Sequence, residues 1–217
     1  MNILVIGTQV NLIEAKQKFG ETHHWQFVPS HWQLEPLLNS MEIVFDFIPE
    51  QIPHVDIYKN ASGIIFFNTA LITLTSIIGK IKFRNLLAFG FCGLPTFLNH
   101  DLLEVTSRKD DQKTLEEVCK KLNTDFAVVA DRIGLVTPRI ICMIINEAYY
   151  TVEEGTATRE DIDLAMKLGT NYPYGPFEWG ERIGENNVCM LLNAVLKDTG
   201  DERYSVCDLL MKEANKK

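Results

Sequence analysis

Short apolar runs separated by polar stretches fill the chain up to Ala130. They have the length of strands and are apolar almost throughout, rather than at alternate positions. The runs cover residues 2–6, 25–28, 42–48, 63–67, 86–91, 102–106 and 126–130. Continuous apolar strands are typical of a parallel sheet covered on both faces. With helical patterns after the first run and over residues 110–122, they predict an α/β domain with a doubly wound sheet and right-handed crossovers.

A helical period replaces these runs after Asp131. Apolar residues recur about every 3.6 positions from Ile140 to Val152, which predicts a helix with a broad buried face. Thr137 is expected to cap this helix, and Pro138 suits its first position because a missing N–H is harmless there. Gly155 supplies a left-handed residue at its C-terminal end.

Further helical signals follow in the same half of the chain. Thr158, with Asp161 three residues later, resembles a capping box and predicts a second helix ending at Gly169. Prolines in residues 172–177 predict an extended turn. Two more helices are expected over residues 187–197 and 206–214. The chain therefore divides into an α/β domain, residues 1–132, and an all-α domain, residues 133–217.

Composition narrows the classes of partner. The chain has 217 residues, 46% of them hydrophobic, and a net charge of −8 at pH 7, so we expect neither nucleic acid nor an anionic membrane as a partner. Five scattered cysteines without a C-x-x-C pair favour reduced, buried thiols, and we expect no metal site. The N-terminus has no secretory signal pattern, so a cytoplasmic location is expected.

Several segments of the second half together form a recognisable signature. They are N-E-A at 146–148, E-E-G at 153–155, E-D-I-D at 160–163, A-M-K-L-G at 165–169 and Y-P-Y-G-P-F-E at 172–178. This pattern resembles the C-terminal domain of the L-3-hydroxyacyl-CoA dehydrogenases. The resemblance covers most of the chain from about Ile133 onward.

The resemblance carries definite expectations. It implies a Rossmann-like domain followed by a helical domain like the C-terminal domain of 6-phosphogluconate dehydrogenase. It implies NAD as cofactor, a role in fatty-acid metabolism and a homodimer formed through the helical domain. An acyl-CoA or another small ligand would occupy the crevice between the two domains.

The first strand does not lead into the glycine-rich turn that grips a dinucleotide. Such a turn needs glycines so that the backbone can approach the pyrophosphate, and an acid about 20 residues later for the ribose. Here Gly7 is followed by T-Q-V-N-L, and the second strand ends V-P-S at residues 28–30 without an acid. Gly7 is the only candidate cofactor-binding residue, and a glycine in this place also serves as an ordinary turn residue.

The catalytic pattern of the family is also incomplete. In the family a His in an H-F-F-N-P segment takes the proton from the 3-hydroxyl, a task that suits imidazole near neutral pH. The matching segment here places Gly90 at the His position and Gly93 at the Asn position. A second family Asn matches Pro138, and an N-T-S-S segment is reduced to Asn68 and Thr69. The acid that orients the His survives as Glu104.

His100 is the only residue that we identify as a replacement base. It lies four positions before Glu104 and could pair with that acid or with Asp101; the simpler interpretation is a solvated loop histidine. His23 and His24 lack a third ligand and favour exposure over metal binding. Cys92 lies in an apolar segment without a neighbouring histidine, which favours an inert thiol.

Two hypotheses follow for the function. The first is a descendant of the dehydrogenases that keeps the fold but has lost most NAD-binding and hydride-transfer residues, and now binds a ligand or a partner. The second is a divergent, active NAD-dependent 3-hydroxyacyl-CoA dehydrogenase with His100 and Glu104 as its catalytic residues. Only residues 30–41 separate the second and third strands, so the first domain is a shortened Rossmann-like domain.

Overall fold

The structure is a computed structural model that describes residues 1–52, 56–59, 61–81 and 85–216. The chain forms two compact units, Met1–Leu135 and Val136–Lys217. Their boundary lies close to the division at residues 132 and 133 suggested by the sequence.

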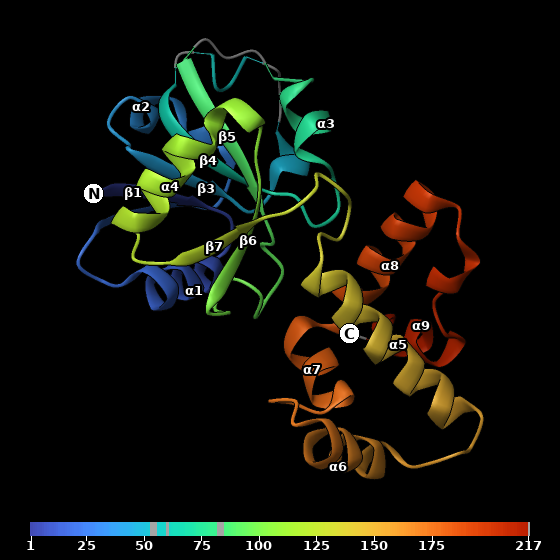
Figure 1. Ribbon diagram of the computed structural model, residues 1–217. Coiled ribbons are helices and arrows are strands. Elements are labelled where there is room, and N and C mark those ends of the chain that lie inside the picture. Colours follow the sequence, from blue (N-terminus) through green and yellow to red (C-terminus); the bar gives the residue numbers. More distant parts are fainter. Residues whose placement is uncertain (53–55, 60, 82–84, 217) are drawn as a thin grey trace. The chain divides into compact units, whose positions relative to one another are not determined.

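The first unit is built on a single mixed sheet of seven strands in the order β2-β1-β3-β4-β5-β6-β7 (Figure 1). The strands are β1 (Asn2–Ile6), β2 (His24–Val28), β3 (Ile43–Asp46), β4 (Ser62–Asn68), β5 (Asn85–Phe91), β6 (Leu102–Thr106) and β7 (Asp125–Val128). All seven predicted strands are present, with small differences at their ends. The doubly wound α/β fold is therefore confirmed.

The direction of the strands changes once across the sheet. Strands β1 to β5 are parallel, with Ile3 beside Ile43 and Ile64 beside Leu87. Strand β6 is antiparallel to β5, with Gly90 opposite Thr106, and β7 runs parallel to β6. From β1 the chain passes to β2 on one side, and from β2 it returns to β3 on the other side of β1. The order of the strands therefore reverses between β1 and β3. In open α/β sheets ligands bind outside the carboxyl ends of the strands at such a point.

Helices cover both faces of the sheet (Figure 1). Helices α1 (Gln9–Phe19) and α4 (Gln112–Lys121) contribute to the core on one face, and α2 (Glu35–Leu38) and α3 (Leu74–Ile78) to the core on the other. Short 3-10 turns occur at η1 (His31–Gln33), η2 (Pro49–Gln51) and η3 (Lys109–Asp111). Because both faces are covered, the strands are apolar on both sides, as their sequences predicted.

The second unit is entirely helical in its described part. Its elements are α5 (Thr137–Glu153), α6 (Arg159–Thr170), α7 (Pro176–Ile183), α8 (Glu185–Thr199), η4 (Glu202–Tyr204) and α9 (Asp208–Ala214). Gly155 follows α5 with φ +72°, and the Thr158 side chain accepts a hydrogen bond from the Asp161 N–H. The predicted stop after α5 and the cap of α6 are confirmed.

Three details of this unit differ from the sequence prediction. Thr137 is not a cap: α5 begins at Thr137 itself, with Val136 as the preceding cap residue, so the Thr137 backbone is already helical. Helix α6 passes Gly169 and ends before Asn171, which adopts a left-handed conformation at φ 57°. Asparagine tolerates this conformation better than most residues, so it can end a helix in place of glycine. Helix α7 begins at Pro176, inside the predicted extended turn, because proline suits a first helical position.

The residues of the recognisable signature join helices to one another. Asp163 on α6 accepts hydrogen bonds from the N–H groups of Phe177 (2.8 Å) and Glu178 (3.1 Å), so it caps the start of α7. Asn146 on α5 is 2% exposed and bonds to the Ser205 carbonyl and the Cys207 N–H, both at 2.9 Å. These contacts give the signature a structural role in helix packing.

Candidate functional site

The carboxyl ends of β1, β3, β4 and β5 form the place where a Rossmann-like sheet binds its ligand. Gly7 lies at the end of β1, and it is tightly surrounded. A Cβ atom added to Gly7 would lie 2.7 Å from Asn11 Oδ1 and 3.0 Å from Phe47 Cβ. The space beside this glycine is therefore occupied by the protein's own side chains.

Two N–H groups at the start of α1 are taken up by its own side chains. The Asn11 Oδ1 accepts hydrogen bonds from the Thr8 N–H and the Thr8 hydroxyl, both at 2.8 Å, and the Asn11 N–H donates to Thr8 Oγ1 at 3.3 Å. A dinucleotide pyrophosphate needs free N–H groups at a helix start and close approach to glycine backbone. The residues at this turn do not fit that group.

Asn68 connects the carboxyl ends of the neighbouring strands β3, β4 and β5 through hydrogen bonds. It is buried, its Nδ2 donates to the Phe47 carbonyl at 3.2 Å, and its Oδ1 accepts from the N–H groups of Ala70 (3.2 Å) and Gly93 (2.9 Å). A Cβ at Gly93 would lie 2.8 Å from both Asn68 and Phe47. These hydrogen bonds assign Asn68 to the sheet framework.

The position matched to the catalytic His of the family is closed by packing. Gly90 lies in β5 between Thr69 and Thr106, which are each 1% exposed. A Cβ on Gly90 would lie 2.6 Å from Thr69 Cγ2 and even closer to the Thr106 hydroxyl. The sheet therefore leaves no room for any side chain at residue 90.

The structure places His100 within the electrostatic influence of Glu104. Burial lowers the pKa of the half-buried His100, and the negative charge of Glu104 acts in the opposite direction. The imidazole also packs on Phe97, with ring centroids 5.5 Å apart. The pair has the composition of an imidazole base with a carboxylate beside it.

Helix α1 fixes the loop that carries His100. Glu14 accepts a hydrogen bond from the Thr96 N–H at 2.6 Å, and the Lys18 ammonium donates to the His100 carbonyl and, at 3.1 Å, to that of Asp101. Thr96 has a φ of +76°. Such a conformation costs a non-glycine residue energy and therefore needs this support. These contacts tie the loop to α1, and burial raises the pKa of Glu14.

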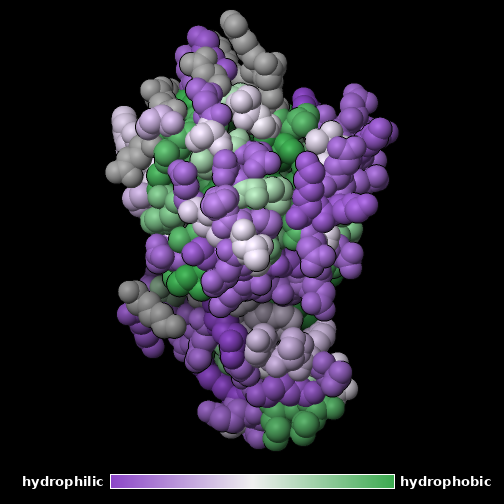
Figure 2. Space-filling model, turned by 90° about the vertical axis from the view of Figure 1, so that its left-hand side faces the viewer, coloured by the Kyte–Doolittle hydropathy of each residue, from purple (hydrophilic) through white to green (hydrophobic). Residues whose placement is uncertain are grey.

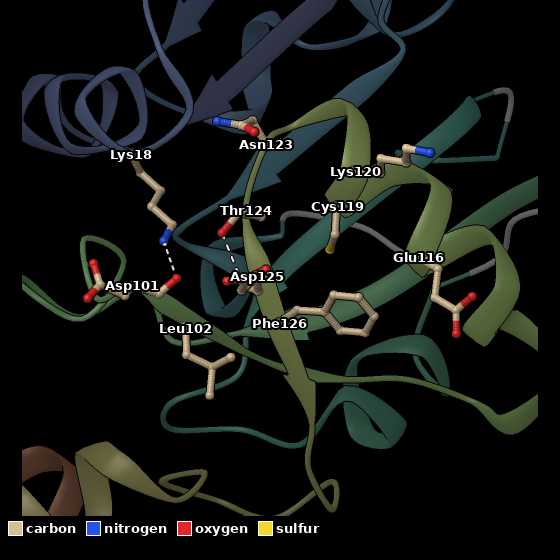
Figure 3. A pocket seen from close by; sticks show the side chains of 10 residues that line it. All are labelled: Lys18, Asp101, Leu102, Glu116, Cys119, Lys120, Asn123, Thr124, Asp125 and Phe126. Atoms are coloured by element: carbon tan, nitrogen blue, oxygen red, sulfur yellow. Dashed lines mark hydrogen bonds between the residues drawn. The ribbon is translucent and has the colours of Figure 1, made fainter.

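A hollow of about 1070 Å³ lies beside this loop (Figure 3). Lys18 reaches into it from α1, Glu116 and Lys120 project from α4, and Phe126 lies on β7. Asp101, Leu102, Cys119, Asn123, Thr124 and Asp125 complete the lining. With two lysines and three acids around it, the hollow has no excess positive charge to attract a CoA or a dinucleotide.

A buried polar cluster, which the sequence did not reveal, lies at the end of β3. Asp46 is fully buried and accepts hydrogen bonds from the Tyr58 hydroxyl at 2.7 Å and the Ile48 N–H at 2.9 Å; its Oδ2 lies 2.8 Å from His31 Nε2. Burial, with the neighbouring Asp46, raises the Tyr58 pKa well above its ordinary value. In the sequence, the sign of this cluster was a lone Asp at the end of an apolar strand.

The cysteines and histidines form no further reactive site in the described part of the chain. All five cysteines are buried and outside disulfide bonds, and burial raises the pKa of the Cys119 and Cys142 thiols to about 12. His24 is exposed, and His23 contacts the edge of Trp25. Within the described ranges, no three His, Cys, Asp or Glu side chains are arranged to hold a metal ion.

In the same ranges, no helix combines the length and the apolar character needed to span a membrane.

The architecture defines a class: a Rossmann-like sheet followed by an all-helical unit. Solved structures of two such proteins match nearly the whole chain. One is the (S)-3-hydroxybutyryl-CoA dehydrogenase of Ralstonia eutropha, with a TM-score of 0.69 and 19% identity over 97% of this chain and 92% of that one. The other is FadB2 of M. tuberculosis, with a TM-score of 0.77 and 15% identity over 99% and 93%. At these identities the likeness shows the fold alone.

Sequence comparison finds relatives of the helical unit. The 3-hydroxyacyl-CoA dehydrogenase C-terminal domain matches residues 134–217. The 3-hydroxyadipyl-CoA dehydrogenase of Escherichia coli is 44% identical over 40% of this chain and 18% of its own length. The 3-hydroxybutyryl-CoA dehydrogenase of Clostridioides difficile is 37% identical over 51% and 41%. The chain thus covers less than half of the length of these relatives, and its helical unit is similar to the C-terminal domain of the 3-hydroxyacyl-CoA dehydrogenases.

Proposed function

We propose that this protein keeps the two-unit fold of the 3-hydroxyacyl-CoA dehydrogenases without their NAD-linked hydride transfer, and acts by binding a ligand or a partner. The observation that carries the proposal is the filled turn after β1. Asn11 and Phe47 occupy the space beside Gly7 where a pyrophosphate would approach, and Asn11 also takes up the Thr8 N–H. NAD is the cofactor that the resemblance to the family implies, and this turn argues against it.

The closed position at residue 90 supports the same proposal independently. Hydride removal from a 3-hydroxyacyl group needs a base on the hydroxyl proton. Gly90 offers no side chain, and Thr69 and Thr106 leave no space for one. Loss of the cofactor grip and of the base position together favours a role other than dehydrogenation.

A divergent, active dehydrogenase is the second candidate, and the His100–Glu104 pair favours it. The carboxylate of Glu104 supports protonation of an imidazole whose pKa burial otherwise lowers. A neutral imidazole beside a carboxylate is suited to accept a proton near pH 7. In this candidate a 3-hydroxyacyl-CoA would be oxidised to the 3-oxoacyl-CoA, as in fatty-acid metabolism, with NAD held in a way that the turn after β1 does not provide.

A fluorescence titration with NADH separates the two candidates. We expect no change in NADH fluorescence upon addition of the purified protein, even at millimolar concentrations, and no oxidation of NADH with acetoacetyl-CoA. Micromolar binding that NAD⁺ reverses would overturn the main proposal. Turnover abolished by both His100→Gln and Glu104→Gln, with Glu116→Gln as an exposed control, would then establish the second candidate.

Three further features belong to this proposal. Binding of an acyl-CoA or another small ligand is the function that the family fold suggests. A homodimer through the helical unit is the expected assembly, and the exposed Ile140 of α5 and the neighbouring hollow of about 340 Å³ offer an apolar surface for it. A cytoplasmic location is also proposed, as the sequence analysis led us to expect.

A further inference from the structure

Strand β2 is the outermost strand of the sheet and pairs on one side only. It lies beyond β1 in the strand order, and its residues bond to β1 along a parallel ladder. The His24 N–H donates to the Met1 carbonyl at 2.9 Å, and the Val28 carbonyl accepts from the Gly7 N–H at 3.1 Å. In a parallel ladder alternate residues face the neighbouring strand. Residues 24, 26 and 28 therefore face β1.

Trp25 and Phe27 consequently direct their backbone N–H and C=O groups away from the sheet. Among the residues that the structure describes, these groups have no backbone partner. Such a row of free donors and acceptors is a template for another strand. The edge is therefore chemically able to continue the sheet.

This edge lacks the features that normally prevent pairing. Proteins protect edge strands with lysine and other charged residues, with proline, or with bulges. Strand β2 reads H-W-Q-F-V and contains none of these residues, whereas the opposite edge strand, β7, begins with the exposed Asp125. Trp32, shortly after β2, is 81% exposed. Because like charges directly opposite each other destabilise paired strands, a strand without Lys, Arg, Asp or Glu can pair with a second copy of itself even in a chain of net charge −8.

We propose that β2 pairs with β2 of a second copy of this chain, antiparallel, around a two-fold axis at Gln26. In this register Trp25 lies opposite the partner's Phe27, and each such pair exchanges both of its hydrogen bonds. In this register the outward N–H and C=O groups of Trp25 and Phe27 are all paired. The same five residues of β2 form each half of the interface. A symmetric interface of this kind needs no second surface.

The side chains suit the same register. Trp25 and Phe27 both pack against the core on the α1 face of the sheet, so they lie on one face of β2. The Trp25 indole N–H donates to the Gly20 carbonyl at 3.1 Å, which holds the ring in place. Pairing places each Trp25 beside the partner's Phe27, and aromatic cross-strand pairs stabilise antiparallel strands. On the other face, Gln26 meets its own symmetry mate.

The interface is independent of the proposed loss of NAD binding, and it differs from a dimer formed through the helical unit. A chain with two different symmetric interfaces forms either a closed tetramer or an open row. The proposal is therefore tested by the change in the mass of the assembly when β2 is altered, whatever the mass of the assembly that the unaltered protein forms.

Charge substitution at Gln26 tests the register directly. Gln26→Lys and Gln26→Glu each place two like charges opposite each other at the axis, so we expect self-association of the full chain to weaken at least about tenfold. An equal mixture of the two variants should restore it, because unlike charges then meet. Sedimentation velocity over a range of concentrations measures both effects. Gln112→Lys, at an exposed position of α4, is the matched control and should change nothing.

A second variant tests the backbone. Phe27→Pro removes an outward N–H without touching the ladder to β1, and it should weaken association as well. Urea unfolding of each variant verifies that it is folded. The inference is overturned if the unaltered chain has the same mass as the Gln26 variants at every concentration. It is equally overturned if the mixture associates no better than either variant alone, which would assign the edge to another partner.

Discussion

Gly90→Ala is the substitution that best tests why the position matched to the family's catalytic His is closed. The added methyl group would enter the space between β5, Thr69 and Thr106. It would lie 2.6 Å from Thr69 Cγ2, well inside van der Waals contact, and both threonines are 1% exposed. Neither side chain has solvent to move into, so the sheet itself must shift.

Overpacking of this kind costs about 1–3 kcal/mol of stability. We expect Gly90→Ala to lower the free energy of unfolding by that amount, measured by urea denaturation followed by circular dichroism. Adding Thr106→Ala, which removes the nearest oxygen, should recover part of the loss, because contacting residues couple in double-mutant cycles. A His at residue 90 should prevent folding of the first unit.

Gly169→Ala provides the matched control. A Cβ at this position meets nothing within 4 Å, and Gly169 lies inside α6. Alanine there should raise stability by about 0.5–1 kcal/mol, because it favours the helix more than glycine does. If Gly90→Ala were neutral or stabilising, the site would have room for a side chain, and the argument against a base at this position would fail.

Three further predictions concern buried polar groups. Tyr58→Phe should cost about 1 kcal/mol of stability at pH 7 because it removes a hydrogen bond to Asp46. Because folding raises the Tyr58 pKa, the stability of the wild type should also fall above pH 10. In urea titrations the variant should not show the share of this fall that Tyr58 causes. Glu14→Gln should stabilise the protein at pH 7 and not at pH 4, because the raised Glu14 pKa makes ionisation unfavourable in the folded state as pH rises through it; an equal effect at both pH values would refute this. Asn146→Ala should lower the thermal unfolding midpoint, at a cost of about 1–3 kcal/mol for the two buried groups left unpaired, and an unchanged midpoint would contradict the assigned role.

The main lines of the fold were predictable because they depend on local patterns. The strands of the first unit are continuous apolar runs, and α5 and α6 carry clear stop and capping signals at Gly155 and Thr158. Helices α2 and α3 escaped prediction because they are one or two turns long and show no helical period. Helix α7 escaped because its prolines indicate a turn as readily as a first helical position.

The candidate site was less predictable because it depends on contacts between distant residues. The scarcity of glycine in the turn after Gly7 was visible in the sequence, but the close approach of Phe47 to Gly7 depends on the pairing of β1 with β3. The cluster at Asp46 joins residues 31, 46 and 58, whose separation follows no motif. The spacing of His100 and Glu104 allowed a pair, although a solvated loop histidine was the simpler interpretation. The contacts of α1 with that loop left no signal in the sequence.

The cap that Asp163 provides for α7 has a consequence for how proteins of this kind are recognised. The carboxylate needs Gly175 beside it, because any larger residue would collide with Asp163, and Pro176 to begin the helix. The most recognisable part of the chain is thus a joint, a contact that fixes α7 to α6 (Figure 1). The face of the molecule seen in Figure 2 is largely hydrophilic. Such a joint reports how the helices are assembled. A sequence search that relies on it will group proteins by architecture, whether or not they share a reaction.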